Sequence, residues 1–151
     1  MDFRSFFYRV NDETLFIRPT VKNNAVSEIE ELDETCYSMQ DGFKIIDQAC
    51  IRSGSSYQGR ADAMKAIFDI KYYPPIPINP TKNLYAFATE SPKNYDCIWV
   101  MTNNIKMVKK RERNSIIYFK NGKRLLIPVS KRRMEIILGR LYQYHIYFKN
   151  L

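Results

Sequence analysis

Residues 115–129 read SIIYFKNGKRLLIPV, and this stretch indicates a β-hairpin. Two runs rich in β-branched and aromatic residues flank Asn121–Gly122, and both of these residues accept the positive φ that a two-residue type I′ turn requires. Such a turn predicts the pairs Ile116–Ile127, Ile117–Leu126, Tyr118–Leu125 and Phe119–Arg124. Because both faces of the hairpin are apolar away from the turn, we expect it to lie inside the domain and not at its rim.

The rest of the chain reads as further short strands and two helices. Strands are expected at 15–21, 27–32, 35–39, 84–89 and 96–101, and FKII at 43–46 opens another that runs toward Cys50. Helices are expected at 57–68, capped by Ser55 or Ser56, and at 131–147, capped by Ser130. The four prolines of YYPPIPINP at 72–80 exclude a helix there. We therefore predict one α+β domain over residues 1–151, made mainly of antiparallel strands.

Composition limits the possible classes. The 151 residues are 45% hydrophobic and 14% aromatic, which suits one domain with a core. No apolar run reaches the length of a membrane span and the N-terminus lacks the features of a signal peptide, so a cytoplasmic protein is expected. Cys36, Cys50 and Cys97 are widely spaced beside a single histidine. This pattern predicts buried thiols, with no metal site and no cofactor.

Positive charge is concentrated near the C-terminus. Residues 101–151 hold 13 Lys or Arg and 2 Asp or Glu, whereas residues 1–50 hold 5 and 10. This polarisation predicts that the basic part faces a polyanion.

Residues 52–60 read RSGSSYQGR and could contact an anion. Gly54 lets the backbone turn, hydroxyls and free amides at a helix N-terminus donate hydrogen bonds, and two arginines add forked hydrogen bonding suited to phosphate. The alternative is an ordinary turn with a serine cap. The candidate contacts in this stretch are Arg52, Ser55, Ser56, Tyr57 and Arg60.

Residues 103–114 read NNIKMVKKRERN, and KRR at 131–133 opens the last helix. Lysine and arginine neutralise phosphates and asparagine reads base edges, although a charge run can also be only a solvated loop. Three cations at a helix N-terminus oppose the macrodipole, and bound phosphates would stabilise them. The candidate DNA contacts here are Asn103, Asn104, Lys106, Lys109, Lys110, Arg111, Arg113, Lys131, Arg132 and Arg133.

Two further patterns leave alternatives open. The last helix carries the apolar stripe Met134, Ile137, Leu138, Leu141 and Tyr144, and a second apolar set outside it, Ile136, Tyr142, Ile146 and Tyr147. Either this helix lies deep in the core or the second set meets another subunit. The run EIEELDE at 28–34 reads as the outer face of strands, and no enzyme is expected. The alternative function is a phosphate-handling or nucleic-acid-cleaving enzyme that uses the 52–60 stretch, with nicking dependent on Asp62 or Asp69.

Several segments, taken in order, resemble the ComK family, the competence transcription factors of Gram-positive bacteria. They are IIDQACIRSGSSYQGR (45–60), YYPPIPINP (72–80), LYAFATESP (84–92), DCIWV (96–100) and FKNGKRLLIPVS (119–130). The resemblance covers roughly residues 15–145. A fainter likeness, from LYAFATES through PVSKRRME, is to LytTR-type domains and favours a strand-rich fold that binds DNA through loops.

The resemblance implies a nucleoid-associated, DNA-binding activator of DNA-uptake genes. It would bind pairs of A-tract and T-tract boxes, largely through the minor groove, as a dimer or larger homo-oligomer. The implied partners are double-stranded DNA, further copies of the chain, RNA polymerase and the adaptor of a Clp protease, with no membrane. Two departures stand out: Thr102, Asn103 and Asn104 replace histidines common in the family, and nothing matches the basic, aromatic tail that the adaptor reads. A regulatory subunit that pairs with a full-length relative is a further alternative.

Overall fold

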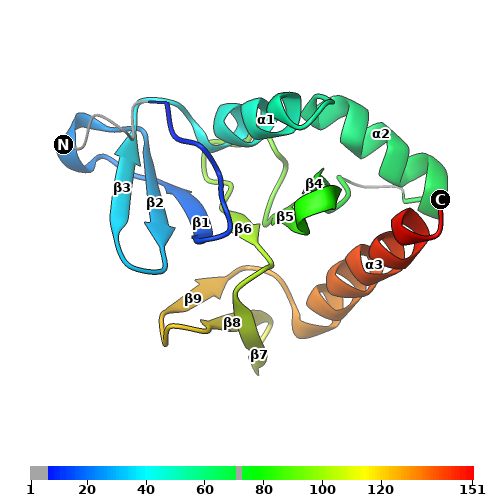
Figure 1. The fold of residues 1–151 in the computed structure, drawn as a ribbon. Coiled ribbons are helices and arrows are strands. Elements are labelled where there is room, and N and C mark those ends of the chain that lie inside the picture. Colours follow the sequence, from blue (N-terminus) through cyan, green and yellow to red (C-terminus); the bar gives the residue numbers. More distant parts are fainter. Residues whose placement is uncertain (1–6, 71–72) are drawn as a thin grey trace.

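Residues 7–70 and 73–151 are described by the structure, a computed structural model with three layers (Figure 1). The middle layer is a six-stranded antiparallel sheet in the order β3-β2-β1-β6-β5-β4. Its strands are β1 (Thr14–Pro19), β2 (Ser27–Glu31), β3 (Thr35–Ser38), β4 (Ile76–Asn79), β5 (Leu84–Ala88) and β6 (Trp99–Met101). Short 3-10 turns lie at Lys22–Asn24 and Pro80–Lys82. The expectation of an α+β fold of mainly antiparallel strands is confirmed.

Each face of this sheet has its own cover. Helices α1 (Gly42–Arg52) and α2 (Tyr57–Phe68) pack on one face. The other face packs against a second antiparallel sheet, β7 (Ile105–Arg111), β8 (Asn114–Phe119) and β9 (Arg124–Ile127), and against helix α3 (Lys131–Lys149). Along β6, Trp99 and Met101 belong to the core on the helix side, while Val100 belongs to the core on the second-sheet side. Because successive side chains of a strand point to opposite faces of the sheet, β6 contributes side chains to both cores.

The predicted strand at 43–46 is wrong, because these residues lie in α1. Asp41 caps this helix, and its carboxylate accepts a hydrogen bond from the Lys44 amide at 2.8 Å. Ile45, Ile46, Ala49 and Cys50 are buried on one side of α1. A short apolar stretch of about one helix turn does not by itself distinguish helix from strand.

The hairpin at 115–129 forms, but its predicted register is off by one residue. Phe119 donates its amide to the Lys123 carbonyl at 2.9 Å, and Gly122 has φ of 90°. The loop therefore has three residues, and Ile117 lies opposite Leu125. Only one face is buried, since Leu126 on the other face is 51% exposed, so the hairpin is a surface element.

Other expectations meet mixed outcomes. Helix α2 begins after its cap Ser56 and α3 after Ser130, as predicted, and Cys36, Cys50 and Cys97 are free and buried. Glu28 and Glu31 are buried, contrary to the expected outer strand face. The described helices include none with the length and apolar character of a membrane span. Tyr72 of the predicted proline segment lies outside the described residues.

Candidate nucleic-acid interface

Five cationic side chains follow one another along β7 and the turn after it, and all five are exposed. This basic strip consists of Lys106, Lys109, Lys110, Arg111 and Arg113. The backbone of 105–111 is not a solvated loop, as one reading of the sequence had it, but an edge strand paired with β8 through Val108–Ile117 and Arg111–Asn114. Within the described residues, no member of the strip forms an ion pair. The strip is therefore available to an external anion.

The outer face of the second sheet adds aromatic and apolar groups to this strip. The register places Lys109 opposite Ile116 and Tyr118 opposite Arg124. Lys109 Nζ lies 5.4 Å from the centre of the Tyr118 ring, within the range of a cation–π contact. Arg124 and Tyr118 are further candidate residues of this surface that the sequence analysis missed, because its register set Arg124 opposite Phe119, a buried side chain.

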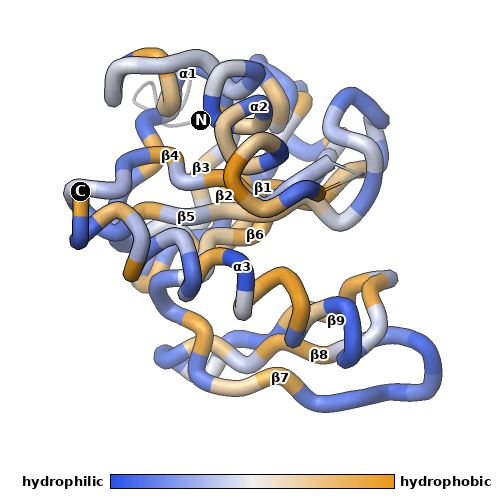
Figure 2. The backbone as a smooth tube through the Cα atoms, turned by 90° about the vertical axis from the view of Figure 1, so that its right-hand side faces the viewer, coloured by the Kyte–Doolittle hydropathy of each residue, from blue (hydrophilic) through white to orange (hydrophobic). Residues whose placement is uncertain are grey.

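The turn between β7 and β8 is a narrow, hydrophilic projection (Figure 2). Arg111 pairs with Asn114, so only Glu112 and Arg113 connect the two strands. Glu112 has φ of 54°, in the left-handed region that a residue with a side chain rarely adopts. Two arginines thus flank the single acidic residue at the end of the hairpin.

The start of α3 lies next to the basic strip, since α3 packs on β7 and β8 (Figure 1). Lys131 and Arg132 are exposed, whereas the Arg133 guanidinium is half-buried, 5.9 Å from the centre of the Tyr73 ring. Ser130 Oγ accepts a hydrogen bond from the Arg133 amide at 3.1 Å. The fold therefore brings the two C-terminal basic clusters of the sequence together.

The 52–60 stretch comprises the last residue of α1, the connection 53–56 and the first turn of α2, in the layer on the opposite side of the six-stranded sheet (Figure 1). The Tyr57 side chain is buried, with its ring centre 5.7 Å from that of Trp99, so it offers no surface to DNA. The Tyr57 amide donates to Asp47 at 2.8 Å and the Gly59 amide to Ser56 Oγ at 3.0 Å. Two of the expected anion donors at this helix start are thus already satisfied by protein groups.

The two arginines of this stretch differ. Arg60 is half-buried and donates to the Ser53 carbonyl at 2.9 Å, so it helps hold the turn. Arg52 is exposed and lines a groove of about 480 Å³ together with Lys82. Partial burial and the nearby positive charge of Arg9 lower the pKa of Arg52, but a guanidinium remains protonated at neutral pH. Arg52 and Lys82 are therefore both exposed cations of this second surface.

The two asparagines that were candidates for base reading hold the backbone instead. Asn104 is buried and donates to the Asp12 carbonyl at 2.8 Å. Asn103 donates to the Asn83 carbonyl at the same distance. These bonds tie the β6–β7 connection to two other segments, which positions β7 at the surface.

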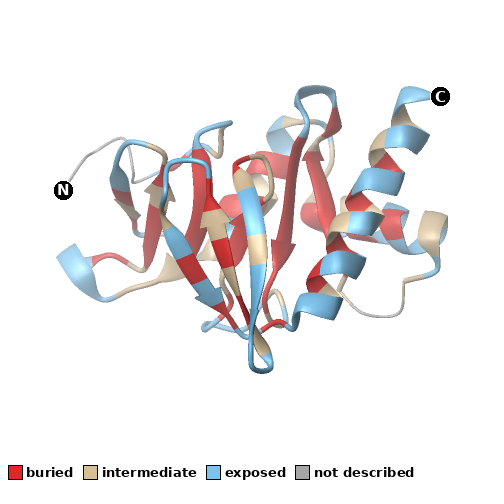
Figure 3. Cartoon of the chain, turned by 90° about the horizontal axis from the view of Figure 1, so that it is seen from below, coloured by how far each residue is buried: buried red, intermediate tan, exposed pale blue. Residues whose placement is uncertain are grey.

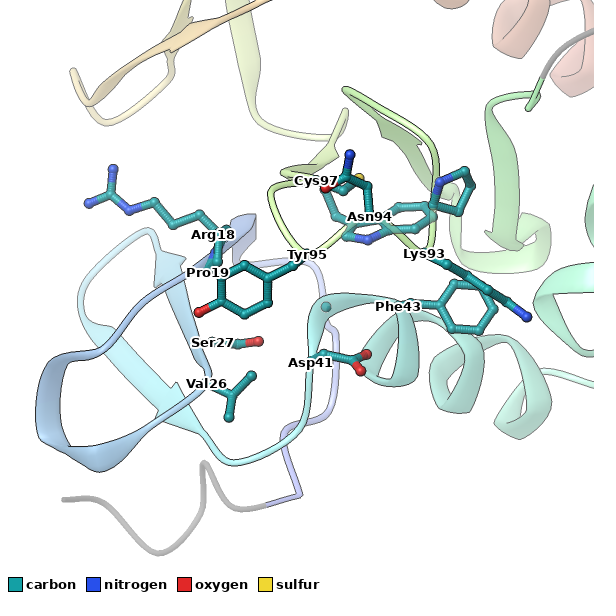
Figure 4. A pocket seen from close by; sticks show the side chains of 13 residues that line it. Arg18, Pro19, Val26, Ser27, Asp41, Phe43, Lys93, Asn94, Tyr95 and Cys97 are labelled. Carbon is teal, nitrogen blue, oxygen red and sulfur yellow. The ribbon is translucent and has the colours of Figure 1, made fainter.

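Two further features of the surface are a hollow beside the start of α1 and a cluster of possible metal ligands. The hollow in Figure 4, of about 390 Å³, is walled by Phe43, Tyr95 and Trp99. Within the described chain, one group of three possible metal-ligand side chains occurs, Glu31, Glu34 and Cys36, whose ligand atoms lie within 4.8 Å of one another. Burial, with Glu31 and Glu34 nearby, raises the pKa of Cys36 to about 12, so this thiol stays protonated. A polyanion would avoid this carboxylate-rich region.

An edge strand with exposed cations beside a cationic helix start is typical of a protein surface that attracts a polyanion. The family is given by comparison: residues 6–150 match the model described as ComK protein, and the chain belongs to the ComK family. It is 30% identical over 130 residues to the "Competence transcription factor" of Bacillus subtilis (strain 168), an alignment that covers 85% of this chain and 68% of that protein. No solved structure matches the chain.

Proposed function

We propose that this protein is a transcription factor that activates competence genes by binding A·T-rich promoter boxes, largely through the minor groove, as a homo-oligomer. The relative described as a competence transcription factor supports the class. The observation that supports the DNA-binding surface is the basic strip, whose five exposed cations form no ion pair in the described part of the chain. RNA polymerase is the partner that activation would require.

The narrow turn of the hairpin formed by β7 and β8 suggests how the basic strip would bind DNA. A minor groove is about 6 Å wide, too narrow for two paired strands but wide enough for one guanidinium. A-tracts narrow the groove further and strengthen its negative potential, which attracts inserted arginine. In this proposal Arg111 and Arg113 enter the groove, while Lys106, Lys109 and Lys110 contact phosphates along its edges.

The remaining candidates take secondary roles in this proposal. Lys131, Arg132 and Arg124 extend the phosphate contacts beside the strip. Arg52 and the hydroxyls of Ser55 and Ser56 lie across the six-stranded sheet from it, so their participation would require the duplex to bend around the domain. Such bending costs a few kcal/mol.

Base analogues test the choice of groove. A 2,6-diaminopurine·T pair adds an amino group in the minor groove and keeps the thymine methyl, whereas an I·C pair leaves the A·T-like minor groove and changes the major groove. We expect diaminopurine in the boxes to weaken binding at least about tenfold and I·C pairs to leave it within about twofold. The reverse ranking in fluorescence anisotropy would assign recognition to the major groove.

No structural observation favours the nuclease alternative. Asp62 is exposed on α2 and accepts a hydrogen bond from Gln58 at 2.8 Å, and Asp69 ends that helix in the left-handed region. Neither belongs to the cluster of possible metal ligands found in the described chain. Incubation of the protein with supercoiled plasmid and Mg²⁺ would reveal nicking directly.

A further inference from the structure

Along helix α3, buried residues lie on one side and exposed residues on the other (Figure 3), and several of the exposed residues are large and apolar. The exposed fractions are 51% for Ile136, 67% for Tyr142, 44% for Ile146 and 45% for Tyr147. Of the two alternatives left by the sequence, burial of the whole helix in the core is therefore wrong. Four large apolar groups on one outward face are more than isolated surface exposure explains.

The outward residues have the spacing of a coiled-coil seam. Ile136, Gly139, Gln143 and Ile146 recur at intervals of three, four and three residues, as the a and d positions of a heptad do. An added Cβ at Gly139 would meet no atom within 4 Å, so the middle of the seam is open to an approaching helix. The seam thus has two isoleucines at its ends and a gap near its centre.

We propose that α3 pairs in antiparallel orientation with α3 of a second copy of this chain, centred near Leu141. In that register Ile136 of each copy packs on Ile146 of the other, and Gly139 accommodates Gln143. This inference rests on the homo-oligomer of the proposed function and names its interface.

Charge complementarity identifies a second copy as the occupant. Glu135, Tyr142 and Lys149 are exposed, seven residues apart, along one flank of the seam. In an antiparallel pair with the stated centre, this flank meets the same flank of the other copy, so Glu135 faces Lys149 twice and Tyr142 faces itself. One two-fold axis therefore satisfies the isoleucine contacts, the glycine gap and both ion pairs.

The same arrangement sets the distance between the basic surfaces of the two copies. Lys131 lies ten residues from the centre, and at about 1.5 Å per residue the two helix starts would be about 30 Å apart. One turn of B-DNA spans about 34 Å. A dimer of this kind could place its two basic strips on neighbouring turns of one duplex.

The first test is chemical cross-linking without DNA. The three native thiols are buried, so a cysteine introduced by Tyr142→Cys is the accessible one for a short bismaleimide. We expect covalent dimers from this variant and none, at equal concentration, from Gln58→Cys, which is exposed on α2. Equal yields from the two variants would overturn the proposal.

The second test is a charge-reversal cycle measured by analytical ultracentrifugation. Glu135→Lys and Lys149→Glu should each weaken dimerisation about tenfold, because each puts like charges opposite one another at two places, and the double variant should restore it. A chain that stays monomeric at high concentration, or a double variant as weak as the single ones, would refute the interface. Since no DNA is present, either failure leaves the DNA-binding proposal standing, and that proposal is tested separately through the strip.

Discussion

The basic strip predicts a quantitative effect on DNA binding when Lys109, Lys110 and Arg111 are replaced together by glutamine. All three side chains are exposed, and none has a carboxylate partner among the described residues. Their removal therefore leaves no buried charge uncompensated. The change in unfolding free energy should stay below about 1 kcal/mol.

The expected loss follows from counterion release. Each phosphate contact contributes about 0.9 to the slope of log K against log salt concentration, so three lost contacts reduce the slope by about 2.7. The two proteins are taken to bind equally at about 1 M salt. At about 0.15 M salt this difference in slope makes the variant bind about 170-fold more weakly than the original protein, which is about 3 kcal/mol.

The assay is fluorescence anisotropy with an A·T-rich duplex over a salt series. The matched control replaces Lys44, Lys65 and Lys93, three exposed lysines of the helix layer and the β5–β6 connection, and it has the same net charge. We expect the control slope to fall by less than about 1. If both triple variants lose the same slope, the effect is one of overall charge, and the assignment of the strip is refuted.

Three further predictions concern stability and reactivity. Glu112→Gly should raise the unfolding free energy by about 1 kcal/mol, because glycine adopts the left-handed backbone at this position without strain. The control Glu112→Gln removes the charge and keeps the strain, so it should not. Thermal denaturation compares the two variants, and equal shifts in their melting temperatures would contradict a backbone cause. Gly42→Ala should destabilise by about 1–3 kcal/mol, because its Cβ would lie 2.8 Å from a buried tryptophan ring. Gly139→Ala, measured at a concentration where the chain is monomeric, should stabilise by about 1 kcal/mol, because the added Cβ meets no atom and alanine favours the helix. Urea denaturation that ranks the two variants otherwise would contradict the packing. Burial raises the pKa of Cys36 and of Cys50 to about 12, so both thiols stay protonated below that pH and should resist alkylation at about pH 8 until denaturant is added; rapid reaction of the native protein would contradict their burial.

Local patterns were informative where a single element carries its own signal. The caps Ser56 and Ser130, the helices after them and the Asn-Gly hairpin were all predicted from neighbouring residues. The hairpin register was not, because the choice between two and three loop residues depends on which face the second sheet presents to the core. Ile117 and Leu125 face the six-stranded sheet together only in the three-residue form.

The candidate site shows the same division. The sequence shows directly that residues 101–151 are strongly basic. It does not show how these cations are arranged in space. The lysines of residues 105–111 lie on an edge strand and not in a loop because this segment pairs with β8. The Tyr57 side chain is kept from solvent because its ring packs against those of Phe43 and Trp99. The predicted cluster at 52–60 was separated from the others by a whole sheet.

The sequence by itself determined the family, the strand-rich class, the helix starts and the uneven distribution of charge, because all of these reside in local composition and spacing. Only the tertiary structure decided which cations share a surface, which asparagines hold the backbone and which side of α3 stays open. Those outcomes depend on contacts between segments far apart in the chain, and the free energy of burial selects among arrangements that local sequence leaves equivalent.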